Sequence, residues 1–99
     1  MKKHDKQDKK LKQYLAAFDN EIVIADGLAD AFVGLVNTSD GLVCVYDKIK
    51  VILILKKKND WDYHEAEEYA DFNIFSAYVK RGPLWIDSVT YRDWNGITD

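Results

Sequence analysis

The hydrophobic positions at the start of this chain recur with a helical period. Leu11, Tyr14, Leu15 and Phe18 are spaced three and four residues apart, and the lysines, glutamines and alanines around them favour the same conformation. This pattern predicts a helix over residues 5–18. An Asp-Asn pair follows and ends the pattern.

The next positions change to patterns that are typical of strands. An Ile-Val-Ile run predicts a short strand near residues 21–25. Two apolar, β-capable segments flank the turn-forming sequence Asn-Thr-Ser-Asp-Gly at 37–41, which predicts a hairpin over residues 31–46. Beyond an Arg-Gly-Pro turn, the sequence Leu-Trp-Ile predicts a last short strand at residues 84–86.

Residues 47–58 support two interpretations. Their continuous, β-branched run favours a buried strand by propensity. Asp47, however, is a good helix N-cap, and apolar residues follow it at helical spacing. The lysines at 56–58 would then complement the C-terminal end of the helix dipole. We favour the helix, and we regard Asp47 as a structural polar residue.

These elements predict an α+β fold in which a small antiparallel sheet packs against two or three helices. The hairpin would provide two strands, and the segments near 21–25 and 84–86 would provide the others. Length and composition predict a single domain over residues 1–99, in which residues 88–99 form a loosely packed tail.

Cysteine use and hydropathy give an expectation about the compartment. Cys44 is the single cysteine, which excludes an intramolecular disulfide, and its apolar neighbours predict a buried, unreactive thiol. The longest apolar stretch, residues 51–55, is far too short to span a bilayer, and no apolar segment typical of a signal peptide follows the first lysines. We therefore expect a cytoplasmic protein with no membrane partner.

Charge is distributed unevenly, although the net charge is only −3. Residues 1–12 hold six lysines against two aspartates, whereas the remainder holds fifteen acidic and eight basic side chains. The segment is either a basic N-terminal arm that touches nucleic acid or a solvated helix end, and its interrupting aspartates favour the second interpretation. A nucleic-acid contact would use Lys2, Lys3, Lys6, Lys9, Lys10 and Lys12.

The most informative segment is acidic and aromatic. Six carboxylates fall within residues 60–71, interleaved with tryptophan and tyrosine. Asp62 and Glu65 can form a capping box, which predicts the start of a helix that runs from Tyr63 to about Val79. Such a helix would meet a basic surface, with aromatic side chains as anchors. The candidate partner-binding residues are Trp61, Asp62, Tyr63, Glu65, Glu68 and Asp71.

A row of small residues on the same helix contains one polar side chain. Ala66, Ala70 and Ala77 share a face with Asn73, which predicts that the asparagine is buried. A buried amide needs hydrogen-bond partners, and we expect them in the backbone of the hairpin or of the last strand. A ligand or partner contact is the alternative role for Asn73.

Other chemistry is weakly supported by the sequence. His64 lies at helical spacing from Glu68, but a metal site needs a further committed ligand, so we predict neither a metal nor a cofactor. Dispersed glycines form no phosphate-binding loop. Aspartates near strand ends could act as acid and base in a small hydrolase, yet cap and turn roles also explain them, so we assign no catalytic residue. These aspartates are Asp26, Asp30, Asp47 and Asp87.

Two motifs follow each other along the chain, a Tyr-Asp-x-x-Lys segment and a Glu-Ala-x-Glu-Tyr-x-x-Phe-Asn segment. Their residues are Tyr46, Asp47, Lys50, Glu65, Ala66, Glu68, Tyr69, Phe72 and Asn73. Together they resemble a family of small uncharacterised proteins of bacteria and bacteriophages. The likeness covers roughly residues 30–86, and it also favours a helix at 47–58. The chain departs from the family in its Lys-Arg pair at 80–81. The resemblance implies a phage or bacterial accessory protein and carries no known activity.

The sequence therefore favours a small, non-enzymatic module that binds a basic, nucleic-acid-processing host or defence protein, as an accessory factor or an inhibitor. The alternatives are a nucleic-acid contact through the lysines and a small hydrolase. Homodimerisation through the hairpin edge or the aromatic side chains is also compatible with so small a core.

Overall fold

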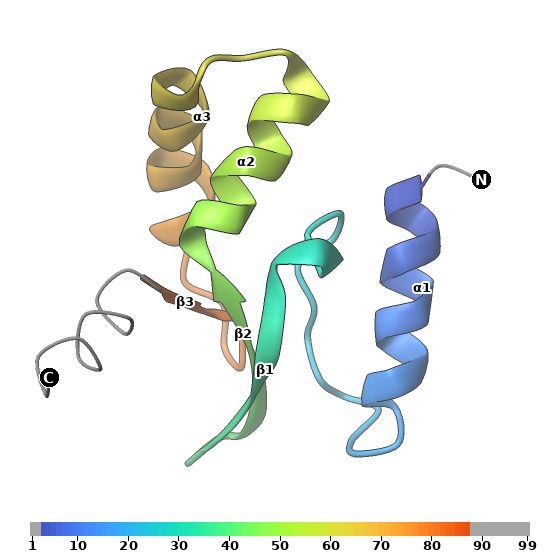
Figure 1. The fold of residues 1–99 in the computed structure, drawn as a ribbon. Helices are drawn as coiled ribbons and strands as arrows, with labels where there is room; N and C mark the ends of the chain where they lie inside the picture. The colour runs from blue at the N-terminus through green and yellow to red at the C-terminus, as the bar shows by residue number, and fades with distance from the viewer. Residues whose placement is uncertain (1–2, 88–99) are drawn as a thin grey trace, which may run out of the picture.

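The computed structural model describes residues 3–87, with side chains from residue 6 onwards, and it has an α+β fold (Figure 1). The chain forms a helix, a hairpin, two further helices and a short strand. The elements are α1 (Lys3–Leu15), the 3-10 turn η1 (Ala29–Ala31), β1 (Phe32–Thr38), β2 (Gly41–Asp47), α2 (Lys48–Asn59), α3 (Tyr63–Ala70), the π turn η2 (Asp71–Phe75) and β3 (Leu84–Ile86). The predicted tail at 88–99 lies outside the described residues.

The three strands form a mixed sheet in the order β1-β2-β3. The predicted hairpin is confirmed: β1 and β2 pair antiparallel, with a register irregularity between Phe32 and Gly34. β3 pairs with β2 in parallel, from Val45↔Leu84 to Asp47↔Ile86, so the prediction of an antiparallel sheet was wrong. The helices between β2 and β3 make this possible: α2 leads away from the sheet, α3 runs back toward it, and the segment after η2 turns the chain so that β3 runs in the direction of β2 (Figure 1).

The strand predicted near residues 21–25 is absent, since this segment is irregular. Its apolar side chains still pack against the core, through Ile22 and Ile24. The backbone N–H of Ala25 donates to the hydroxyl oxygen of Tyr46 at 3.0 Å, and nearby Gly27 N–H donates to Asp8 at 2.8 Å. Side chains thus satisfy backbone donors that a strand would place in a ladder.

Residues 48–59 form the helix α2, as favoured from the sequence, and Asp47 is its N-cap. The buried Asp47 carboxylate accepts hydrogen bonds from the backbone N–H groups of Ile49 at 2.9 Å and Lys50 at 3.2 Å. The cap and the inward packing of apolar side chains outweigh the β-propensity of the segment.

Replacing Asp47 with alanine should therefore lower the free energy of unfolding by about 0.5–2 kcal/mol, the usual cost of losing a capping side chain. Urea denaturation measures this difference. Asp47→Asn is the matched control, because asparagine caps helices as well as aspartate does. Equal losses for the two variants would show that capping is not the role of Asp47.

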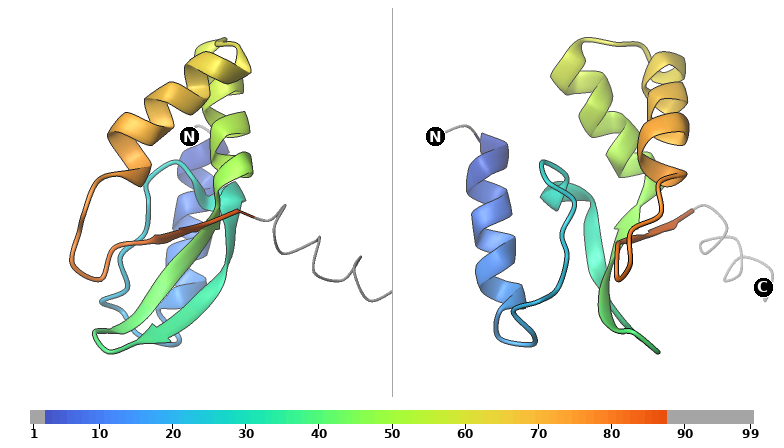
Figure 2. Two further views of the ribbon diagram at one scale, coloured as in Figure 1. Left: turned by 90° about the vertical axis from the view of Figure 1, so that its left-hand side faces the viewer. Right: turned by 180° about the vertical axis from the view of Figure 1, so that it is seen from behind.

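The core joins α1, the hairpin, α2 and α3. Leu11 and Leu15 of α1 belong to the same buried cluster as Cys44 and Tyr46 of β2. α2 contributes Val51, Ile52 and Leu55, and α3 contributes Ala66 and Ala70. Figure 2 shows α1 alongside the hairpin, while α2 and α3 pack against each other. Cys44 is fully buried, as predicted, and burial raises the pKa of its thiol.

Helix ends differ from the prediction by several residues. The first helix ends at Leu15 and continues as turns to Phe18, and the third ends in the π turn η2 at Phe75 instead of near Val79. Within the described part of the chain, none of the helices is both long and apolar enough to cross a membrane.

Candidate functional site

The acidic segment begins α3 through the predicted capping box, which is confirmed. The Asp62 carboxylate accepts from the backbone N–H of Glu65 at 2.8 Å, and the Glu65 carboxylate accepts from the backbone N–H of Asp62 at 3.2 Å. These reciprocal bonds satisfy two donors at the helix start. They also hold the Glu65 carboxylate at the first turn of α3.

α3 buries only small side chains against α2. Ala66 and Ala70 are fully buried, which lets the two helices approach closely and leaves the larger side chains of α3 on the outside. The outer face consequently holds most of the carboxylates and rings of this segment. Its aromatic residues are partly exposed, with Tyr69 at 44% and Phe72 at 79% of the accessible surface.

These side chains line an open groove of about 360 Å³, which we call the acidic aromatic groove. Its lining consists of Trp61, Glu65, Glu68, Tyr69, Phe72 and Asn73. The rings of Trp61 and Tyr69 lie 5.3 Å apart between centroids, with an interplanar angle of 50°. The groove therefore combines contiguous aromatic surface with two carboxylates.

Among the described side chains, the carboxylates of the groove have only a weak cationic neighbour. Glu68 lies 3.7 Å from Nε2 of His64, but both side chains are well exposed. Among the side chains described, neither Glu65 nor Glu68 forms an ion pair with a lysine or an arginine. The groove is therefore available to a cation from outside the chain.

Four of the six predicted partner-binding residues lie in or beside the groove, and the other two do not line it. Trp61, Glu65 and Glu68 line the groove, and Asp62 lies beside it as the N-cap of α3. Tyr63 and Asp71 are exposed but do not line it. Desolvation, with the charges of Glu67 and Asp87, raises the pKa of Tyr63, which places this ring near other acids.

Two aromatic members of the groove were not among the predicted site residues. Tyr69 follows Glu65 by four positions, and Phe72 follows Glu68 by four. Residues at this spacing are neighbours on a helix surface, so the spacing was a signal that could have identified both.

The prediction that Asn73 is buried was wrong. Its side chain is exposed, and its amide nitrogen donates to the carbonyl oxygen of Tyr69 at 3.1 Å, within the same helical segment. The change from α-helix to π turn at Asp71 alters the angular position of the residues that follow, so the small-residue face does not continue straight. The hydrogen bond of the Asn73 amide therefore lies within its own helical segment, and not with the backbone of the hairpin or of the last strand as expected.

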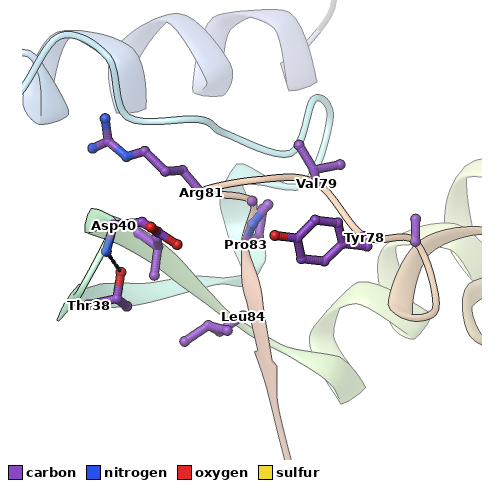
Figure 3. A pocket seen from close by; sticks show the side chains of 10 residues that line it. Thr38, Asp40, Tyr78, Val79, Arg81, Pro83 and Leu84 are labelled. Atoms are coloured by element: carbon purple, nitrogen blue, oxygen red, sulfur yellow. Dashed lines mark hydrogen bonds between the residues drawn. The ribbon is translucent and has the colours of Figure 1, made fainter.

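A second pocket, of about 220 Å³, lies beside the hairpin end (Figure 3). Arg81, at its edge, extends toward the end of α1, where its guanidinium donates to Asp19 at 3.0 Å and to the carbonyl oxygen of Leu42 at 3.2 Å. The backbone N–H of Glu21 and the Arg81 guanidinium lower the pKa of Asp19. Arg81 therefore joins the segment after α1 to the start of β2. The other side chains that line this pocket are mainly apolar.

The lysine-rich segment is part of a packed helix. Leu11 is buried against the core, and the Asp8 carboxylate holds the loop at Gly27, so residues 3–12 do not form a detached arm. The outward-facing lysines of α1 are Lys6, Lys9, Lys10 and Lys12. Lys2 and the side chain of Lys3 lie outside the described part.

Two of the four strand-end aspartates serve separate local roles. Asp47 caps α2, while Asp30 accepts a hydrogen bond from the Gln7 amide at 3.4 Å. Within residues 6–87, no three side chains of histidine, cysteine, aspartate or glutamate are arranged to hold a metal ion. Comparison of the chain with protein-family models, curated proteins and solved structures finds no match.

Proposed function

We propose that this protein is a small, non-enzymatic binding module whose acidic aromatic groove contacts a basic surface on a larger protein. The observation that carries this proposal is the exposure of aromatic rings beside two carboxylates that have no lysine or arginine partner among the described side chains. Exposed aromatic side chains at a rim of charge are typical anchors of protein interfaces.

The two components of the groove would have separate effects on binding. The carboxylates would steer a basic partner toward α3, which raises the association rate and makes it fall with ionic strength. The rings would supply the apolar contact that slows dissociation. The resemblance to phage and bacterial proteins favours a nucleic-acid-processing host or defence protein as the partner, with this protein acting in the cytoplasm as an accessory factor or inhibitor.

Neutralising the groove tests this proposal without disturbing the helix. In the Glu65→Gln/Glu68→Gln variant, glutamine retains the capping-box bond that lysine at position 65 would lose. Asp26→Asn/Asp40→Asn is the matched control, because it changes the net charge equally at two exposed positions elsewhere. Affinity capture from bacterial lysate, followed by mass spectrometry, should yield a basic partner with the wild type and the control, and lose it with the groove variant.

The captured partner should then be purified and its affinity measured at several salt concentrations. We expect a loss of at least about tenfold for the groove variant, equivalent to about 1.4 kcal/mol. Equal affinity for the groove variant and the control would contradict the proposal.

A nucleic-acid contact is the second candidate, favoured by the four outward-facing lysines of α1. Fluorescence anisotropy with labelled DNA and RNA oligonucleotides tests it directly. Salt-sensitive binding that Lys9→Gln/Lys10→Gln/Lys12→Gln abolishes, and that Glu65→Gln/Glu68→Gln leaves intact, would favour this function over protein binding.

A further inference from the structure

We propose that the acidic aromatic groove recognises the guanidinium group of an arginine side chain, and that it prefers arginine to lysine. This inference rests on the proposed function and specifies the chemistry of the basic partner. Its basis is the combination of exposed ring faces with carboxylates on one open surface, because a carboxylate cluster alone would attract either cation.

The rings provide the first part of the argument. Phe72 is 79% exposed and contributes apolar surface that no described part of the chain covers. Trp61 and Tyr69 pack against each other at 5.3 Å, which fixes a second aromatic surface in the same groove. A planar, weakly hydrated guanidinium stacks on such surfaces and gains both dispersion and cation–π attraction.

The carboxylates provide the second part. Glu65 and Glu68 are three residues apart on α3, so both lie on the side of the helix that lines the groove. A carboxylate accepts two parallel N–H bonds from guanidinium, a geometry that an ammonium group cannot reproduce. Asn73 uses its amide nitrogen for the Tyr69 carbonyl, which leaves its amide oxygen as a further acceptor at the groove.

Lysine would gain less from the same surface. Its ammonium group is compact and strongly hydrated, and an open groove does not displace that water. Lysine would therefore bind chiefly through charge, whereas arginine would bind through charge and stacking. The preference should consequently depend on the aromatic rings more than on the carboxylates.

Two peptides of equal charge test this preference with the full-length protein. The probes are the acetylated, amidated sequences Arg-Gly-Arg-Gly-Arg and Lys-Gly-Lys-Gly-Lys, titrated by NMR with the tryptophan indole signals as the readout. We expect the arginine peptide to bind about tenfold more tightly, which corresponds to a difference of about 1.4 kcal/mol between the two peptides. The indole signal of Trp61, which lies in the groove, should shift more than the signals of the other two tryptophans.

Phe72→Ser should abolish most of the preference, because it should lower the affinity for the arginine peptide and leave the affinity for the lysine peptide nearly unchanged. Phe18→Ser is the matched control, since Phe18 is also exposed, at 55%, but lies just beyond α1. Glu65→Gln/Glu68→Gln should lower the affinity for both peptides. Circular dichroism verifies that every variant is folded.

The outcomes separate this inference from the proposed function. Equal affinity for the two peptides, or equal effects of Phe72→Ser and Phe18→Ser, would overturn arginine selection even if a basic partner is captured through the carboxylates. Failure of both peptides to bind, together with failure of the groove variant to affect capture, would overturn the inference and the proposed function.

Discussion

Replacing Tyr46 with alanine should lower the free energy of unfolding by about 3–5 kcal/mol, the usual range for removing a large buried ring. Tyr46 is fully buried, and its ring packs edge-on against Phe32, with 6.0 Å between ring centroids, and lies tilted against Trp85, with 5.4 Å between centroids. The lost ring would leave a cavity at the contact between β2 and β3. Because a domain of this size has a total stability of about 5–15 kcal/mol, the variant should be close to unfolding.

The phenol hydroxyl of Tyr46 should account for a separate part of this loss. Its oxygen accepts the backbone N–H of Ala25, and burial raises the pKa of the phenol to about 12, so the group stays neutral. Tyr46→Phe keeps the ring but orphans that N–H, at a cost of about 1–3 kcal/mol. Urea denaturation of both variants measures the two parts, and a Phe variant as unstable as the Ala variant would contradict this division.

Enlarging Ala66 to leucine should destabilise the protein by about 1–3 kcal/mol or more, because a close-packed contact cannot accept three additional carbons without displacing α3. Ala66 is fully buried within a cluster that includes Val51 and Leu55 of α2. Thermal and urea denaturation measure the loss.

His64→Leu is the control on the same helix, since His64 is exposed and leucine has good helix propensity. Its stability should stay within about 0.5 kcal/mol of the wild type. Similar losses at the two positions would show that packing against α2 is not what limits the Ala66→Leu substitution.

Part of the acidic aromatic groove was predictable from local sequence. The interleaved acids and aromatics identified Trp61, Glu65 and Glu68, and the capping box predicted where α3 begins, because capping depends on residues three positions apart. Tyr69 and Phe72 followed from helical spacing in principle. The exposure of Asn73 could not be predicted from helical spacing, because a π turn changes the angular position of later residues. The sequence pattern contains no signal for that turn.

The sequence by itself determined the features that depend on neighbouring residues: the hairpin with its turn at 37–41, the cap at Asp47 and the segregation of lysines from carboxylates. Only the tertiary structure decided how the chain returns to the sheet. β3 lies parallel to β2 because the chain leaves the sheet through α2, returns through α3 and turns again before β3, and the irregular segment at 21–25 bonds the Tyr46 hydroxyl through the backbone N–H of Ala25. These features depend on contacts between residues distant in sequence, which no local periodicity records.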